Sequence, residues 1–323
     1  MESAQQEAIL KGWEAMAPGF GCSDLPARLD PLARCKIYTS LAFERLQRKE
    51  DDLNELFERS AQNWQQTLYL MLLRTVGDLQ NREAFMALGE RVTLQSLMRE
   101  RHSLVGVEAL LFGGAGLLEG CRDDAYIRQL REEFEHLRHK YCIEPLDSTL
   151  WRINRLRPAN HPRLRLAQIA ALVMQPDFSI EKILECRTRE AVEHLFAVEA
   201  QQYWSSYYNP SGAIDHTAKR LGHEKAHSLG INLVAVLQYF YGHRMGREEL
   251  TRRAIELWEA LPAEQNRYTR LWERITPMNA FESQALLQLA REYCERTRCR
   301  QCPLAKHRLY ELKREMERTN RSR

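Results

Sequence analysis

Three cysteines near the C-terminal end of the sequence could together bind a metal. Cys294, Cys299 and Cys302 fall within nine residues in the pattern C-x4-C-x2-C, and His307 follows five positions later. Thiolates this close in sequence are typical ligands of zinc or of a small iron–sulfur cluster. The pattern identifies ligands and names no reaction, and three ordinary thiols at a junction between two helices are the alternative.

The spacing of these cysteines restricts the local structure that a metal would need. Successive residues of an α-helix turn by about 100°, so Cys294 and Cys299 would point about 140° apart on one uninterrupted helix. The helix that contains Cys294 must therefore end near residues 296–300, a tight turn must follow, and Pro303 must begin the last helix. The role of such a metal would be structural rather than catalytic. The candidates for a fourth ligand are His307, which is nearest in sequence, and the distant Cys22, Cys35, Cys121, Cys142 and Cys186.

A second stretch matches a metal-binding pattern letter for letter. His223, Glu224 and His227 form H-E-x-x-H, in which two histidines share a helix face and the glutamate activates a zinc-bound water. Leu233 stands where the longer form of this pattern needs a third histidine, so the third ligand would be an acid such as Glu248 or Glu249. A zinc-dependent hydrolase is therefore one alternative function.

An arginine-rich segment with two prolines could bind an anion. Pro158 and Pro162 stiffen the chain, Asn160 or His161 can cap the following helix, and Pro162 suits its first turn. Free amides at the start of that helix, flanked by arginines, would suit a phosphate. The alternative is a rigid turn whose arginines pair with acidic residues. The predicted nucleic-acid or anion-binding residues are Arg155, Arg157, Asn160, Arg163 and Arg165.

Two further segments resemble binding motifs mainly in composition. The glycines of residues 108–118 lack the lysine that ends a phosphate-binding loop, so they predict close packing between helices. The aromatic residues at 203–208 could stack on nucleic-acid bases, but they are more typical of a core and its rim.

Composition and charge restrict the class of protein. The chain has 323 residues with 44% hydrophobic residues, enough for a core, and no uninterrupted apolar stretch long enough to span a membrane. The N-terminus lacks a secretory signal, which predicts a cytoplasmic protein whose cysteines are thiols or metal ligands. Residues 291–323 carry a net charge of +6 and residues 151–165 carry +5, although the whole chain carries only +3. Two basic segments on an acidic remainder indicate directed anion binding.

Helical periodicity runs through most of the chain and predicts a mainly α fold, a multi-helical globular array. Short strands near residues 148–156 stay open as an alternative. We expect an N-terminal helical region at 1–150 and a C-terminal one at 151–323, or one continuous domain. Helices are expected at 33–49, 51–77, 103–118, 124–141, 162–175, 222–242, 246–260, 279–297 and 303–319.

Several motifs, taken in order, resemble those of the bacterial domain-of-unknown-function 2851 family, found mostly in Bacteroidetes. They include EALLFGGAGLL at 108–118, LRPANHPRLRLAQIAAL at 156–172, LGINLVAVLQYFYG at 229–242 and SQALLQLAREYCERTRCRQC at 283–302. Cys22 and the residues from Glu44 to Lys49 are also similar to the family's pattern.

The resemblance implies no activity, because none is established for the family. Its longer members begin with a segment that resembles a restriction endonuclease, and this chain is expected to be a short form without it. Some RecB-like nucleases use one distant and three clustered cysteines for an iron–sulfur cluster, an analogy that places Cys22 beside Cys294, Cys299 and Cys302.

The function that we expect is a non-catalytic helical module that associates with DNA or RNA and is stabilised by its cysteines. Structural zinc or an iron–sulfur cluster is the expected cofactor, if there is one. The alternatives are a scaffold for a separate nuclease partner and the zinc hydrolase. No membrane association is expected, and the sequence does not decide whether the protein is an enzyme, although it favours a non-enzyme.

Overall fold

The computed structural model describes residues 2–16, 22–200, 202–207, 209, 212, 214–272 and 275–321. The prediction of a mainly α, multi-helical fold is confirmed. Residues 148–150 form a turn of 3-10 helix, and within the described ranges no strand forms there or elsewhere. Pairing between extended segments is seen as two isolated bridges, Glu199 with Arg220 and Pro262 with Asn279.

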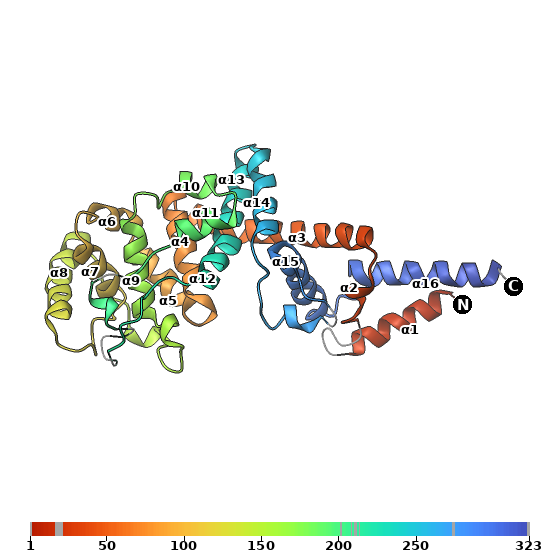
Figure 1. Ribbon diagram of the computed structural model, residues 1–323, viewed down its shortest axis with the longest axis horizontal. Helices are drawn as coiled ribbons and strands as arrows, with labels where there is room; N and C mark the ends of the chain where they lie inside the picture. Colours follow the sequence, from red (N-terminus) through yellow and green to blue (C-terminus); the bar gives the residue numbers. More distant parts are fainter. Residues whose placement is uncertain are drawn as a thin grey trace. The chain divides into compact units, whose positions relative to one another are not determined.

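The chain divides into two compact units. Unit 1 comprises residues 1–51 and 258–323, and unit 2 comprises residues 52–257 (Figure 1). This division does not coincide with a boundary near residue 151, because unit 2 is one continuous stretch and unit 1 takes segments from both sides of it.

Unit 1 is built around the part of α3 (Pro31–Arg59) that precedes residue 52, and around α15 (Ala280–Gln288). Arg45 of α3 is buried, and its Nε donates to Oε1 of Gln284 on α15. One turn later, Arg48 forms an ion pair with Glu292 at 2.8 Å. The remaining helices of unit 1 are α1 (Glu2–Ala15), α2 (Leu25–Arg28) and α16 (Pro303–Arg321).

Unit 2 contains the remaining helices, several of them short. Among them, α7 packs on α8 and α9, α4 packs on α5, and α11 packs on α12. The helices are α4 (Trp64–Val76), α5 (Asp78–Arg91), α6 (Leu94–Arg99), α7 (Leu104–Gly114), α8 (Ala125–Tyr141), α9 (Pro162–Met174), α10 (Ile180–Glu185), α11 (Arg189–Leu195), α12 (His223–Leu229), α13 (Ala235–Arg244) and most of α14 (Glu248–Ala260).

The glycines of α7 permit the close packing that the sequence predicts. A Cβ atom added to Gly113 would lie 2.1 Å from Cγ of Phe134 on α8, and one added to Gly114 would lie 2.4 Å from a methyl group of Val92. Gly113 and Gly114 are therefore packing positions, and α7 is buried along almost its whole length.

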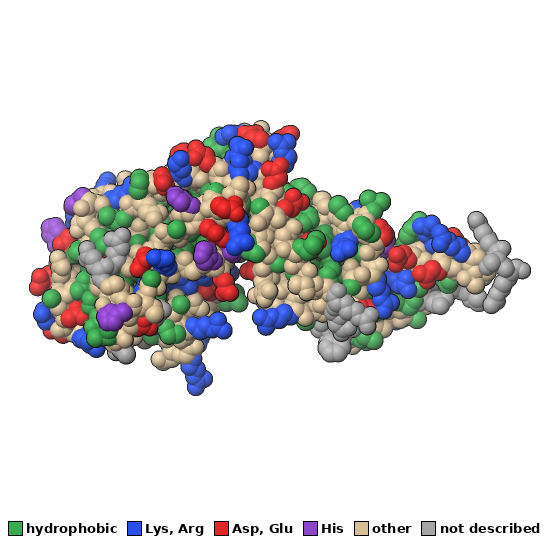
Figure 2. All heavy atoms as spheres, viewed as in Figure 1, with side chains coloured by type: hydrophobic (Ala, Val, Ile, Leu, Met, Phe, Trp, Pro, Cys, Tyr) green, Lys and Arg blue, Asp and Glu red, His purple; other side chains and the backbone are tan. Residues whose placement is uncertain are grey.

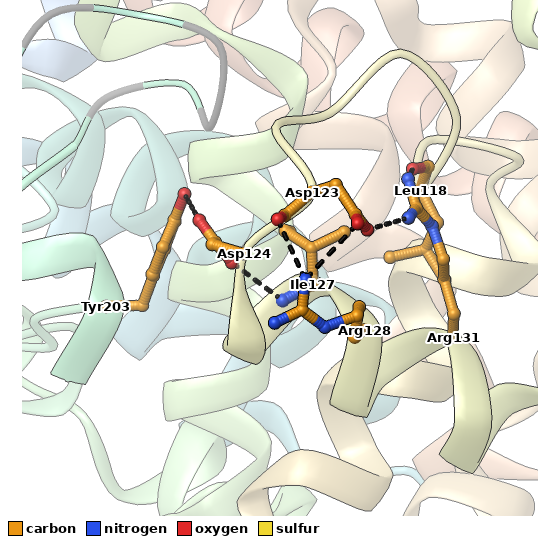
Figure 3. Close-up of polar contacts among 7 residues, drawn as sticks. All are labelled: Leu118, Asp123, Asp124, Ile127, Arg128, Arg131 and Tyr203. Carbon is orange, nitrogen blue, oxygen red and sulfur yellow. Dashed lines mark hydrogen bonds and ion pairs between the residues drawn. The ribbon is translucent and has the colours of Figure 1, made fainter.

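The start of α8 is held by two neighbouring acids (Figure 3). Asp124 caps the helix by accepting from the N–H of Ile127, and it also accepts from the hydroxyl of Tyr203 at 2.8 Å. Asp123 pairs with Arg128 at 3.2 Å and with Arg131 at 2.9 Å. Tyr203 thus has a structural role in unit 2.

The other aromatic residues of this region stack on one another. Trp204 is fully buried against Phe112, and the ring of Tyr203 stacks between those of Tyr126 and Tyr207. The core-and-rim interpretation of residues 203–207 therefore fits the structure. Tyr208, the last aromatic residue of this segment, lies outside the described residues.

A carboxyl group is buried beside these rings. Glu108 of α7 is 2% exposed, and its Oε2 accepts from the hydroxyl of Tyr126 at 2.9 Å. Burial raises the pKa of Glu108 to about 7, although hydrogen bonds from Tyr126 and Trp204 act in the opposite sense. Since this pKa is higher in the folded than in the unfolded chain, the free energy of unfolding should fall as pH rises from about 4.5 to 7.

We therefore expect the variant Glu108→Gln to lose this pH dependence. Relative to the wild type, its free energy of unfolding should rise by about 3 kcal/mol between pH 4.5 and pH 8, since the amide does not ionise. Urea denaturation at a series of pH values measures this difference. Glu119→Gln, a change at an exposed residue of the same unit, is the control and should follow the wild-type profile. A parallel profile for Glu108→Gln would contradict the prediction.

In the described part of the chain, no helix is both long and apolar enough to cross a bilayer. On the face shown in Figure 2, basic and acidic side chains are interspersed.

Candidate metal centre

The helical stretch that carries Cys294 ends at that residue, slightly before the predicted 296–300. After α15 the chain makes a π-helical stretch, Leu289–Cys294, and the residues that follow form a turn in which Thr297 has a φ of 49°. The last helix, α16, begins at Pro303. The predicted interruption between Cys294 and Cys299 is therefore confirmed, and it lets the two thiols approach each other.

Cys302 immediately precedes α16 and is buried. Burial raises the pKa of its thiol to about 12, whereas the backbone N–H groups of Leu304 and Ala305, which donate to the sulfur, act in the opposite sense. These amides belong to the first turn of α16, where the N–H groups lack partners within the helix. A metal at this sulfur would remove its proton, and the amides would stabilise the thiolate.

Cys22 lies beside Cys294, although 271 residues separate them in sequence. Their thiols are hydrogen-bonded to each other, which lowers the pKa of Cys22 and raises that of Cys294. Both residues belong to unit 1, so the contact is internal to one compact body. The structure brings together the distant and the clustered cysteines that the RecB analogy pairs.

The other two cysteines belong to the same group. Burial raises the pKa of Cys299, and the nearby Cys22 acts in the same direction. Cys22 and Cys299 also raise the pKa of Cys302. The group of Cys22, Cys294, Cys299 and Cys302, here called the cysteine group, therefore has four mutually interacting thiols in the number that a tetrahedral zinc ion or a four-iron cluster needs.

His307, the other candidate for the fourth ligand, has a different neighbour. Its Nε2 lies 3.3 Å from Oε1 of Glu311, one turn further along α16. Of the alternatives left open by the sequence, the geometry favours Cys22. All eight cysteines are free of disulfides, and two of the other candidates have backbone partners, since Cys121 donates to the carbonyl of Leu117 and Cys186 to that of Lys182.

Acidic side chains accompany part of the basic C-terminal segment. Arg300, between two of the cysteines, pairs with Glu7 at 2.5 Å and with Glu14 at 3.4 Å, both on α1. Arg296 pairs with Glu292 at 3.2 Å. The ion pairs of Arg300 connect the turn of the cysteine group to the first helix of unit 1.

The arginines that open α9 are mostly buried. His161 caps α9 by accepting from the N–H of Arg163, and Pro162 is the first helical residue, in agreement with the predicted roles. Arg163 is 6% exposed, and its guanidinium donates to the carbonyls of Leu117 and Glu119. Backbone carbonyls of unit 2, rather than a ligand, hold this side chain.

Arg165 is similarly buried, and its guanidinium donates to Gln168 at 2.9 Å and to Asn160 at 2.8 Å. Arg155, Arg157 and Asn160 are exposed. The predicted anion site thus separates into buried structural arginines and the exposed Arg155 and Arg157, which stay available to a phosphate.

The histidines of the H-E-x-x-H stretch share one face of α12, with ring centroids 6.3 Å apart. An acid from α11 joins them: Oε1 of Glu193 lies 2.6 Å from Nε2 of His227 and 3.6 Å from Nδ1 of His223. Arg189 also donates to this oxygen at 2.7 Å. Arg189 and then His227 lower the pKa of Glu193 to about 2, so the carboxyl group is an anion at neutral pH.

Glu193 was not identified from the sequence, where Glu248 and Glu249 were the candidates for a third ligand. In the described residues, Glu193, His223 and His227 are the group of three whose donor atoms all lie within 4.8 Å of one another. Glu193 lies on α11, upstream of the H-E-x-x-H stretch, and reaches the histidines because α11 packs on α12. The motif gives no indication of this residue.

A comparison with protein families gives one match. The family model for DUF2851, described as a protein of unknown function, matches residues 7–267, which is most of the chain. The chain belongs to the DUF2851 family. No curated protein and no solved structure matches it.

The DUF2851 match covers some of the candidate ligands and leaves out others. Cys22, the α9 segment and the group of Glu193, His223 and His227 lie within the match, whereas Cys294, Cys299 and Cys302 lie beyond it. The DUF2851 assignment confirms the predicted family, and it brings no activity, because the family is one of unknown function.

Proposed function

We propose that this protein is a non-catalytic helical module in which the cysteine group holds a structural metal centre and basic residues associate with nucleic acid. The observation that carries the proposal is the contact between Cys22 and Cys294 in unit 1. Four thiols from two sequence-distant segments of one compact unit would together supply the donor set of a metal centre, and a bound cation would favour their thiolate forms.

An iron–sulfur cluster suits the cysteine group better than a single zinc ion. Zinc binds four thiolates at about 2.3 Å, which brings all the sulfur atoms close to one another. Among the described residues, no three of these sulfurs meet the 4.8 Å limit that the group of Glu193 meets. In a four-iron cluster each thiolate binds a different iron, so its ligands lie further apart, and the contacting thiols of Cys22 and Cys294 would have to separate to bind it.

The centre would connect the segment before α2 to the turn before α16. Cys22 would supply the distant ligand, Cys294 and Cys299 the two sides of the turn, and Cys302 the start of α16. The thiols would bind the cluster as thiolates, whose negative charge the iron ions would compensate. The free energy of binding would then stabilise unit 1.

Nucleic-acid association is supported by exposed cations. Residues 291–323 carry a net charge of +6, and Arg298, Lys306 and Lys313 of this segment are exposed. Arg155 and Arg157 are exposed in unit 2. Cations of this kind bind phosphates without reading sequence, so the proposed partner is the backbone of DNA or RNA.

The metal centre is tested by elemental analysis and an absorption spectrum of protein purified without air. We expect about four iron atoms per chain with broad visible absorption that disappears on oxidation. Zinc in stoichiometric amount would mean that the cysteine group is a zinc site rather than an iron–sulfur site. Protein without either metal would refute the metal centre.

Nucleic-acid binding is tested by a salt series with a duplex and a single strand. The logarithm of the association constant should fall linearly with the logarithm of the salt concentration. The double variant Lys306→Gln/Lys313→Gln should reduce the magnitude of this slope for duplex by up to about 2. Lys182→Gln in unit 2 is the control. If the chain does not bind at low salt, or if salt has no effect, this part of the proposal is wrong.

A further inference from the structure

Two short helices of unit 2 bring together a second set of metal-binding groups. Helix α11 packs on α12, and Glu193 on the first faces His223 and His227 on the second. The two histidines are four residues apart, so one helix face presents both. The three side chains come from different turns of a packed pair of helices within one unit.

The chemistry of these donors is that of a zinc site. Two imidazole nitrogens and one carboxylate oxygen are a common catalytic zinc ligand set, with zinc about 2.0–2.2 Å from each atom. Tetrahedral ligands at that range lie about 3.3 Å from one another. The 3.6 Å separation of His223 and Glu193 already fits, and the 2.6 Å separation of His227 and Glu193 would need to open slightly.

The three ligands also differ in freedom in a way that suits metal entry. The side chains of His227 and Glu193 are 13% and 22% exposed, so packing limits their movement. The side chain of His223 is 79% exposed and can rotate toward an arriving ion. Two positioned ligands and one adjustable ligand can close on a metal without moving the helices.

A simpler explanation is an ion-pair cluster. Arg189 donates to the same oxygen of Glu193 that contacts His227, and this contact satisfies the carboxylate without a metal. The two explanations differ in the effect of Arg189. In an ion-pair cluster it is a partner of Glu193, whereas in a metal site it competes with the cation for the carboxylate.

We propose that Glu193, His223 and His227 bind a divalent transition-metal ion, for which zinc is the best match, with its remaining coordination positions open to solvent. Glu193 takes the place of the downstream acid that the motif suggested. Glu224 is exposed on α12 and is not one of the ligands. This site is independent of the cysteine group and uses nitrogen and oxygen rather than sulfur.

The test is titration of the metal-depleted 323-residue chain with Zn²⁺ and, in parallel, with Co²⁺ as a spectroscopic probe. The site of Glu193, His223 and His227 should bind one equivalent of metal. Co²⁺ bound there should show visible d–d absorption without the intense sulfur-to-cobalt bands that Co²⁺ in the cysteine group would give. Failure at one centre is therefore distinguishable from failure at the other.

Zinc binding by variants of the proposed ligands shows whether this equivalent of metal is bound by them. Glu193→Gln and His223→Ala should each weaken zinc binding by more than about tenfold, the smallest loss typical of changes even in outer-sphere partners. His223 is exposed, so its removal does not threaten folding. His194→Ala, a change at an exposed histidine next to Glu193 on α11, is the control and should bind zinc as the wild type does.

Arg189→Ala separates the two explanations, because removal of a competitor should tighten zinc binding. Unchanged binding in Glu193→Gln and His223→Ala, or weaker binding in Arg189→Ala with the fold intact by circular dichroism, would overturn the proposal.

Discussion

Protein with serine in place of Cys302 should lose its metal and much of the stability of unit 1. Cys302 is a buried member of the cysteine group, so its loss leaves three thiolates that cannot complete a four-ligand centre. The choice of serine isolates the metal, since its hydroxyl can still accept from the first amides of α16. We expect the free energy of unfolding of unit 1 to fall by about 3 kcal/mol or more.

Elemental analysis and thermal unfolding, both on protein prepared without air, measure this change. Cys35→Ser is the matched control: Cys35 lies on α3 of the same unit, is exposed and does not belong to the cysteine group. It should keep the metal content and the melting temperature of the wild type. Equal metal content in Cys302→Ser and the wild type would show that this thiol is not a ligand.

The second large effect is expected from Gly113→Ala on α7. In an ordinary helix this change stabilises by up to about 1 kcal/mol, because alanine has the higher helix propensity. Here the new methyl group would lie 2.1 Å from the ring of Phe134, and its three nearest atoms would all belong to that buried ring. Overpacking should dominate and destabilise unit 2 by about 3 kcal/mol.

Gly106→Ala on the same helix is the control, since its Cβ would find its nearest atom at 3.4 Å, an ordinary contact. Chemical denaturation should place Gly106→Ala close to the wild type and Gly113→Ala well below it. Phe134→Leu should recover part of the loss in combination with Gly113→Ala. If Gly113→Ala were as stable as Gly106→Ala, α7 and α8 would not approach as closely as the structure shows.

Features set by local geometry could be predicted from the sequence. The angle between Cys294 and Cys299 on a helix required an interruption, and the turn before Pro303 supplies it. The stiff Pro158–Pro162 stretch predicted a capped helix start, which His161 provides. The bare glycines of residues 108–118 predicted tight packing, and Gly113 and Gly114 confirm it.

Features set by tertiary partners could not be predicted in this way. The predicted helix at 51–77 is broken at Ala61 and Gln62, which both adopt positive φ angles that neither residue type signals. Charge alone did not distinguish the buried Arg163 from the exposed Arg157, because backbone carbonyls of Leu117 and Glu119 serve Arg163 in place of acids. Glu193 approaches the histidines only through the packing of α11 on α12.

The discontinuity of unit 1 has a consequence for biosynthesis. The ribosome delivers Cys302 nearly three hundred residues after Cys22, with all of unit 2 emerging between them. At about 5–20 residues per second, the N-terminal segment must wait roughly 15–60 seconds for its partner helices. Unit 2 has all its residues before α15 and α16 exist, so the cysteine group can assemble only after the ribosome has passed residue 302, and a product truncated before that residue cannot acquire the proposed centre.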